Sequence, residues 1–315
     1  RAIAAGFGAT LGHAGIAPLP APGARAPGPL RIGYLSPDLR AHPVGFLLRD
    51  VLPAHDPARA AVRIYAATPR PDWLTAELRG RLPDWHEATM ADDAALAARI
   101  RADAIDVLVD LGGHTAHNRL GVLARLPARR HCVFLGWFAG VGVPGIDGLV
   151  LGRDQLGAAA GAFLPEPALA IAGTQFRYRP VPYAPAVASL PALRNGAVTF
   201  GSFNNTAKLN PEVLACWAAL LQAVPGSRLM LQWKTLADEA LRQTLAVRMA
   251  RLGVDPARLF LLGASDHPTL LARYGEVDIA LDPFPFPGGM TSLEALPQGV
   301  RVVTLAQERP VSRQT

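Results

Sequence analysis

The sequence has little lysine, little cysteine and no long apolar run. Of its 31 lysine and arginine residues, only Lys208 and Lys234 are lysines. The two cysteines, Cys132 and Cys216, lie in apolar surroundings without a C-x-x-C partner, which favours two buried thiols in a reducing compartment over a disulfide framework or a zinc site. No stretch reaches the roughly 18 apolar residues of a membrane span, and no charged-then-apolar leader opens the chain, so we expect a cytoplasmic protein without a membrane segment.

The fingerprints of two enzyme classes are also missing. There is no G-x-S-x-G, so catalytic serine chemistry finds no support, and no G-x-G-x-x-G, which a dinucleotide oxidoreductase carries after a strand. The net charge is +6, but the arginines are scattered and are not interleaved with aromatic residues, so we expect no nucleic acid partner. With half of its residues hydrophobic and 18% charged, the chain has the composition of a globular protein.

What the sequence does contain is an alternation of strands and helices in two series. The first series predicts strands at 31–36, 61–67, 105–111, 131–137 and 148–153, and helices at 43–52, 72–82 and 92–102. The second predicts strands at 198–203, 228–233, 259–263, 278–282 and 301–305, and helices at 211–224, 236–252, 267–274 and 291–296. Such alternation indicates βαβ units, so we predict an α/β fold of two Rossmann-like domains whose parallel sheets face one another across a cleft.

Composition indicates where these domains begin and end. Residues 1–29 are rich in alanine, glycine and proline, which is typical of a linker or of the remnant of an upstream helical repeat. Residues 155–195 lose periodicity and gain prolines. We therefore predict an N-terminal domain at 30–175, an interdomain connection at 176–195 and a C-terminal domain at 196–315.

The loops that lead from a strand into a helix are the candidate binding loops, because ligands of such sheets bind beyond the carboxyl ends of the strands. In "FGSFNNTAKLNPEVL", Asn210 can cap a helix that starts at Pro211, and Lys208 lies just before the cap. A helix N-terminus beside a compact cation favours a phosphate ligand. The alternative is that Lys208 is a solvated surface lysine.

A second candidate phosphate cradle is "LDPFPFPGGMTSLEAL". Gly288 and Gly289 would let the backbone approach a ligand closely, and the missing lysine distinguishes the loop from a Walker motif. Thr291 and Glu294 have the spacing of a capping box. Glu294 therefore either closes that box or accepts hydrogen bonds from ribose hydroxyls.

Two loops of the first series carry imidazoles. Asp38 and His42 in "SPDLRAHPVGFLL" could orient or deprotonate a hydroxyl; alternatively, Asp38 stabilises the loop and His42 starts the helix. In "VDLGGHTAHNR", His114 and His117 follow two glycines. Because no carboxylate ligand is near, these histidines favour a polar lining of the cleft over a metal site.

Together and in this order, these loops resemble the catalytic region of the protein O-GlcNAc transferase family, whose bacterial members often follow tetratricopeptide repeats. The resemblance covers about residues 30–315 and is carried by "RIGYLSPDLRAHPVGFLL", "DVLVDLGGHT", "VFLGW", "FGSFNNTAKLNPEVLACWAALLQAVPGSRLML", "DIALDPFPFPGGMTSLEAL" and the terminal "VVTL" and "VSR". It implies a GT-B fold and an inverting, metal-independent transfer of N-acetylglucosamine from UDP-GlcNAc to Ser or Thr of a protein. The implied partners are a UDP-sugar donor and a protein or peptide acceptor, with no cofactor, and the absence of any Asp-x-Asp agrees with this.

The resemblance also implies roles for individual residues. Lys208 would contact the donor diphosphate and Asn205 the uridine nucleotide, while Asp38 and His42 would lie beside the reacting centre. Three catalytic candidates result, namely Lys208, His42 and Asp38. The further positions that would contact the nucleotide sugar are Gly288, Gly289, Met290 and Thr291 in the phosphate turn, Glu294 at the ribose, Leu135 and Gly136 beneath the sugar, and His114 in the polar lining.

The chain departs from the family pattern at several positions. Residues 137–139 read Trp-Phe-Ala where the family usually has Tyr-Pro-Gly, and Met290 replaces a hydroxyl of the phosphate turn. The chain stops at Thr315, where GT-B enzymes continue with helices, so the C-terminal domain is expected to be truncated. These departures leave two alternatives open: a GT-B transferase with another UDP-sugar or a small-molecule acceptor, or a degenerate scaffold domain without activity.

Overall fold

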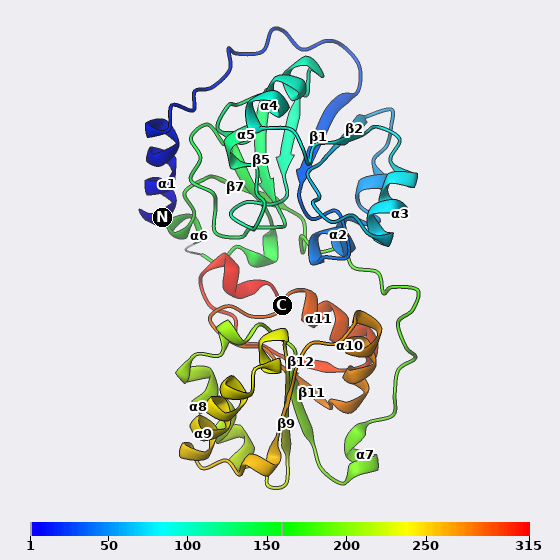
Figure 1. Ribbon diagram of the computed structural model, residues 1–315, viewed down its shortest axis with the longest axis vertical. Helices are drawn as coiled ribbons and strands as arrows, with labels where there is room; N and C mark the ends of the chain where they lie inside the picture. The colour runs from blue at the N-terminus through cyan, green and yellow to red at the C-terminus, as the bar shows by residue number, and fades with distance from the viewer. Residues whose placement is uncertain (1, 159) are drawn as a thin grey trace. The chain divides into compact units, whose positions relative to one another are not determined.

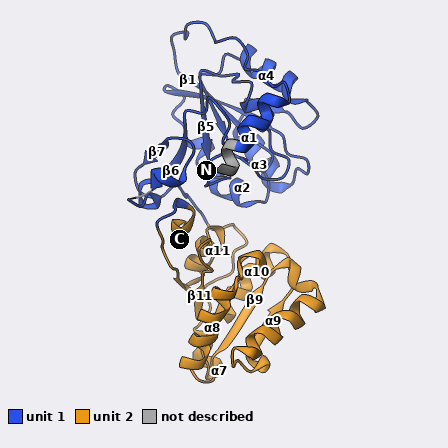
Figure 2. Ribbon diagram, turned by 90° about the vertical axis from the view of Figure 1, so that its left-hand side faces the viewer, with its two compact units in different colours: residues 1–179, 308–310 blue, residues 180–307, 311–315 orange. Residues whose placement is uncertain are grey.

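The computed structural model describes residues 2–158 and 160–315. The chain divides into two compact units, one formed by residues 1–179 with 308–310 and the other by residues 180–307 with 311–315 (Figure 2).

The first unit contains a seven-stranded parallel sheet in the order β3-β2-β1-β4-β5-β6-β7. Its strands are β1 (Leu30–Ser36), β2 (Ala60–Ala66), β3 (Trp85–Glu87), β4 (Val107–Asp110), β5 (Arg130–Phe134), β6 (Gly148–Gly152) and β7 (Ala168–Ile171). Its helices are α1 (Ala2–His13), α2 (Pro43–Leu48), α3 (Trp73–Arg81), α4 (Asp93–Ala102), α5 (Leu120–Leu123) and α6 (Ala160–Phe163).

The second unit contains a five-stranded parallel sheet in the order β10-β9-β8-β11-β12. Its strands are β8 (Thr199–Ser202), β9 (Arg228–Gln232), β10 (Leu259–Leu262), β11 (Ile279–Leu281) and β12 (Arg301–Val303). Its helices are α7 (Pro191–Asn195), α8 (Pro211–Ala223), α9 (Glu239–Arg251), α10 (His267–Arg273) and α11 (Met290–Ala295). Helices α8 and α9 lie on one side of this sheet, and α10 and α11 lie on the other (Figure 1). The prediction of an α/β fold with two parallel sheets is confirmed.

Each unit has its own apolar core, and the core of the second unit illustrates how helical spacing builds it. Val213, Trp217 and Leu221 of α8 recur every four residues and are almost fully buried against the sheet. Cys216 directly precedes Trp217, about 100° away around the helix and outside this buried row, and is exposed. The expectation of two buried thiols is therefore correct for Cys132 and wrong for Cys216.

The N-terminal stretch is attached to the first unit. Phe7 and Leu11 of α1, and then Ile16 and Leu19, pack against the core of that unit. The Leu19 amide donates to the Arg125 carbonyl at 2.7 Å. Residues 14–29 form no helix or strand.

Strand order positions the candidate loops. In the first sheet the order reverses between β1 and β4, and in the second between β8 and β11. Loops leaving the carboxyl ends of such a strand pair diverge to opposite faces and leave a crevice, where ligands of open α/β sheets bind. The loops predicted from sequence to bind a ligand follow these four strands, and β5 supplies a fifth.

None of the helices in the described part of the chain combines the length and the apolar character needed to cross a bilayer.

Candidate functional site

The ammonium group of Lys208 lies against the loop that precedes α11. Its Nζ donates to the Pro287 carbonyl at 2.7 Å and to Asn204 Oδ1 at 3.2 Å, and lies 4.1 Å from the centre of the Phe286 ring. Burial lowers the pKa of Lys208 to about 8, against the opposing effect of the Asp282 charge. Lys208 is therefore not a solvated surface lysine, and it lies next to the predicted glycine loop.

Local sequence explains how the loop that carries Lys208 is held. Asn210 is the N-cap of α8, where its Oδ1 accepts from the Val213 amide at 2.9 Å, and Pro211 occupies the first helical position, as predicted. Asn210 Nδ2 also donates to the Phe284 carbonyl at 2.7 Å. One side chain thus starts a helix and ties the Lys208 loop to the loop of the neighbouring strand β11.

The turn formed by Pro287, Gly288 and Gly289, here called the glycine turn, is fixed by a buried carboxylate. Asp282 directly follows β11, is 6% exposed, and accepts from the Gly288 amide at 3.0 Å. A Cβ atom on Gly288 would lie only 2.5–2.6 Å from side-chain oxygens of Asp282, Thr291 and Ser292. Only glycine fits this position without displacing its surroundings.

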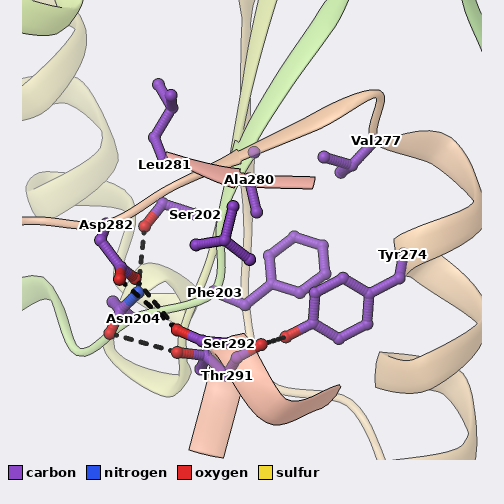
Figure 3. A pocket seen from close by; sticks show the side chains of 12 residues that line it. Ser202, Phe203, Asn204, Tyr274, Val277, Ala280, Leu281, Asp282, Thr291 and Ser292 are labelled. Carbon is purple, nitrogen blue, oxygen red and sulfur yellow. Dashed lines mark hydrogen bonds between the residues drawn. The ribbon is translucent and has the colours of Figure 1, made fainter. Parts of the chain in front are cut away.

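A pocket lies at the β8–β11 reversal of strand order, where Asp282, Thr291 and Ser292 line it (Figure 3). Its lining is drawn from the ends of both strands, the segment before β11 and the start of α11. The lining residues are Gly201, Ser202, Phe203, Asn204, Tyr274, Val277, Ala280, Leu281, Asp282, Thr291, Ser292 and Val302. We call it the β8–β11 pocket.

The amide side chain inside this pocket is Asn204, which sequence reasoning missed. Asn204 is 6% exposed; its Oδ1 accepts from Lys208 and, at 3.5 Å, from Thr291 Oγ1. Asn205, the predicted nucleotide contact, is exposed, and its Oδ1 accepts from the Ala207 amide at 3.0 Å. A polar residue directly after a strand was the signal, but the sequence does not say which of two adjacent asparagines points inward.

Helix α11 begins differently from the capping box that its sequence indicates. The helix starts at Met290 with Gly289 as its N-cap, and no side chain caps it. Glu294 is 5% exposed, and its Oε1 pairs with His267 Nε2 at 2.9 Å. The interpretation of Thr291 and Glu294 as a capping box is wrong, because Thr291 already lies inside the helix.

In the first unit, Asp38 and His42 lie close together but are not hydrogen-bonded. His42 is the N-cap of α2, where its Nδ1 accepts from the Val44 amide at 3.3 Å and lies 3.9 Å from Asp38 Oδ2. Burial lowers the pKa of His42, opposed by the Asp38 charge and aided by the Arg40 charge. Because Nδ1 is an acceptor, the neutral ring carries its proton on Nε2.

His114 is packed into the loop after β5. Its Nε2 donates to the Val141 carbonyl at 2.8 Å, and its ring lies edge-on to the rings of Phe7 and Trp137, with centroids 4.6 and 5.4 Å away. Trp137 Nε1 in turn donates to the Gly140 carbonyl at 2.9 Å. Hydrogen bonds to carbonyls of the same loop thus hold the segment where the chain departs from Tyr-Pro-Gly. Of the two ring nitrogens of His114, Nε2 makes this contact and Nδ1 does not.

Leu135 and Gly136 follow β5 and approach the end of β4. Leu135 has a φ of 68°, and a Cβ on Gly136 would lie 1.9 Å from the Leu111 carbonyl oxygen. At the same strand end, Asp110 is 1% exposed and accepts from the Gly113 amide at 2.6 Å. Burial raises the pKa of Asp110 to about 6. Sequence reasoning missed this carboxylate.

Comparison with known proteins places these loops in a family. Residues 19–156 and 184–315 match the sequence profile described as Glycosyl transferase family 41. The chain belongs to glycosyl transferase family 41. A curated relative from Arabidopsis thaliana, named "Probable UDP-N-acetylglucosamine--peptide N-acetylglucosaminyltransferase SPINDLY", is 36% identical over 288 residues, which are 88% of this chain and 31% of the relative. The chain therefore spans about a third of the length of the curated relatives that it matches.

Solved structures agree with the family 41 assignment. A mutant of the Thermobaculum terrenum O-GlcNAc transferase has a TM-score of 0.90 at 35% identity, covering 95% of this chain and 57% of that one. Anabaena Alr3699/HepE, solved with UDP and glucose, has a TM-score of 0.53 at 16% identity, covering 89% of this chain and 82% of that one, and this likeness concerns the fold alone. The predicted resemblance to O-GlcNAc transferases and the GT-B assignment are confirmed.

The family 41 chain has no cluster of three or more histidine, cysteine, aspartate or glutamate side chains that could hold a metal ion, within residues 2–158 and 160–315.

Proposed function

We propose that this chain is the catalytic region of a transferase that moves N-acetylglucosamine from UDP-GlcNAc to Ser or Thr hydroxyls of a protein or peptide. The observation that carries the proposal is the Lys208 ammonium, held against the glycine turn at the edge of the β8–β11 pocket. A fixed cation beside backbone amides is the arrangement that stabilises a diphosphate. The names of the relatives support N-acetylglucosamine as the sugar and a peptide as the acceptor.

The proposed reaction is a single displacement. The acceptor oxygen attacks the anomeric carbon and gives up its proton, the bond from that carbon to the diphosphate oxygen breaks, and UDP leaves with inversion of configuration. In this scheme Lys208, the glycine turn and Thr291 stabilise the negative charge that grows on the diphosphate. Glu294 and the two asparagines, Asn204 and Asn205, bind the nucleoside.

We assign the remaining residues to the sugar and the acceptor. Asp38 and His42 would orient the acceptor hydroxyl, with His42 Nε2 as a hydrogen-bond donor in the neutral state. His114, Leu135 and Gly136 would lie beside the sugar. The test is mass spectrometry of an acceptor protein incubated with UDP-GlcNAc, UDP-glucose or no donor. Selective addition of N-acetylglucosamine supports the proposal; addition of glucose alone contradicts the assigned sugar, and absent UDP binding by calorimetry points to a scaffold.

Affinity for UDP is expected to fall as the pH rises through about 8, because Lys208 loses its proton there. Only the charged lysine attracts the diphosphate, so the apparent Kd should rise about tenfold from neutral pH to one unit above that pKa. Titration calorimetry with UDP from about pH 7 to about pH 9 measures this. The variant Lys208→Met serves as the control, since its weak affinity should not change over the same range; an equal pH dependence in both proteins would assign the effect to another group.

Transfer is expected to continue in the presence of a chelator. In the proposed scheme the Lys208 charge stabilises the diphosphate as a divalent cation would, and the sequence contains no Asp-x-Asp to hold such a cation. Initial rates with EDTA and with added magnesium should agree within about twofold, which is a free-energy difference below 1 kcal/mol. A complete loss of activity in EDTA that magnesium restores would contradict the metal-independent mechanism.

A further inference from the structure

Three side chains from separate segments of the second unit form a continuous hydrogen-bonded series. Tyr183 OH lies 2.8 Å from His267 Nδ1, and His267 Nε2 lies 2.9 Å from Glu294 Oε1. The rings of Tyr183 and His267 also meet edge-on, with centroids 5.7 Å apart. Tyr183 precedes α7, His267 is the first residue of α10, and Glu294 lies in α11 (Figure 1).

Only one arrangement of protons satisfies all three groups while the ring is neutral. An ionised carboxylate can only accept, so His267 Nε2 carries the proton and donates to Glu294. Nδ1 is then an acceptor, and the Tyr183 hydroxyl donates to it. The hydrogen bonds run from Tyr183 through His267 to Glu294, so the phenol sets the orientation of the imidazole, and the imidazole fixes one carboxylate oxygen.

The second carboxylate oxygen remains available. No described residue makes a hydrogen bond to Glu294 Oε2, although the side chain is only 5% exposed. Glu294 follows Thr291 by three residues and therefore lies on the same face of α11 as this lining residue of the β8–β11 pocket. A carboxylate with one oxygen fixed and the other without a described partner, about one helical turn from a lining residue of the pocket, is suited to accept from a sugar hydroxyl.

We infer that Tyr183 and His267 are positioning residues that hold Glu294 for recognition of the ribose hydroxyls of the nucleotide. The inference deepens the proposed function and rests on it. The competing explanation is that His267 and Glu294 only join α10 to α11, as the Tyr274 hydroxyl does when it donates to the Thr291 carbonyl at 2.9 Å. The two explanations differ in one measurable respect, because only the first depends on whether the ligand carries ribose hydroxyls.

The experiment compares UDP with 2′,3′-dideoxy-UDP by titration calorimetry on the whole chain. The unsubstituted protein should bind UDP more tightly by about tenfold or more, as expected for hydrogen bonds to a charged acceptor. Tyr183→Phe and His267→Leu should each reduce this preference, the second almost to none, while the affinity for dideoxy-UDP stays within about twofold. His267→Gln keeps an N–H donor for Glu294 and should retain most of the preference.

Asp266→Ala is the matched structural control. Asp266 caps α10 beside His267 by accepting from the Thr269 amide at 2.9 Å, and makes no hydrogen bond to Glu294. This variant should lower the melting temperature but leave the preference for UDP over dideoxy-UDP unchanged.

The possible outcomes separate the inference from the proposed function. The inference is overturned if His267→Leu lowers the affinities for UDP and dideoxy-UDP by the same factor. It is also overturned if the unsubstituted protein binds the two ligands with equal affinity. In both cases UDP binding still supports the proposed function. If the unsubstituted protein binds neither ligand, the proposed function is overturned, and the inference with it.

Discussion

Replacing Lys208 by methionine is expected to reduce glycosyl transfer by about a hundredfold to a thousandfold, the cost of removing one preorganised donor from a developing anion. Methionine keeps most of the length and the apolar stem of lysine but has no charge. The ammonium contacts only the Pro287 carbonyl, Asn204 and the Phe286 ring in the described structure, so its loss leaves the cores untouched. The melting temperature should therefore change little, and rates from mass spectrometry measure the effect.

The chain supplies a matched control for this experiment, because its second lysine lies in the same unit. Lys234 is exposed, at the start of the 3-10 turn Lys234–Ala237, and lines no part of the β8–β11 pocket. Lys234→Met removes the same charge from the protein and should leave transfer within about twofold. Equal rates for Lys208→Met and the unsubstituted protein would contradict the assigned role of Lys208; equal losses in both variants would indicate a general effect of net charge.

Replacing Gly288 by alanine is expected to weaken UDP binding by about a hundredfold, because the added methyl group displaces the glycine turn. The Cβ atom would lie 2.5–2.6 Å from oxygens of Asp282, Thr291 and Ser292, closer than van der Waals contact allows. Either the turn moves away from these side chains or they rotate out of place. Such overpacking costs about 1–3 kcal/mol of unfolding free energy, comparable to the roughly 2.7 kcal/mol of a hundredfold loss in affinity, so binding and stability are both measured.

Gly80→Ala is the control for this substitution. Gly80 lies inside α3 of the first unit, and apart from its chain neighbours and the nearby backbone of the helix no atom lies within 4 Å of its added Cβ. The methyl group should raise the unfolding free energy by about 0.5–1 kcal/mol and leave the UDP affinity unchanged. Calorimetry and thermal unfolding of both variants measure the two quantities. Unchanged UDP affinity in Gly288→Ala would show that the glycine turn does not contact the diphosphate.

Most of the fold follows from local patterns, and the elements that sequence analysis missed have physical reasons. The predicted strands are short apolar runs between helices with a repeating apolar face, and the structure contains them. β3 has only three residues, Trp-His-Glu, and carries no apolar run. β7 reads Ala-Leu-Ala-Ile, but its four residues are exposed and too few to distinguish a strand from a loop. β7 also lies within the proline-rich stretch 155–195, where no periodicity remains.

The site was predictable as a set of loops but not as a set of contacts. Strand-to-helix transitions identify the Lys208 loop and the glycine turn, because parallel strands bring their carboxyl ends to one edge. The partners of a side chain depend on residues far along the chain. Asp282 meets the Gly288 amide, and Glu294 meets His267 rather than the start of its own helix. The choice between Asn204 and Asn205 depends on backbone direction after β8, which composition does not encode.

The central claim is that the Lys208 ammonium and the glycine turn bind one diphosphate. A crystal structure of the chain with UDP tests it most directly. We predict the β-phosphate within about 3 Å of Lys208 Nζ and of backbone amides at the start of α11, with Nζ released from the Pro287 carbonyl. A diphosphate bound elsewhere, with Lys208 still donating to Pro287, would contradict it.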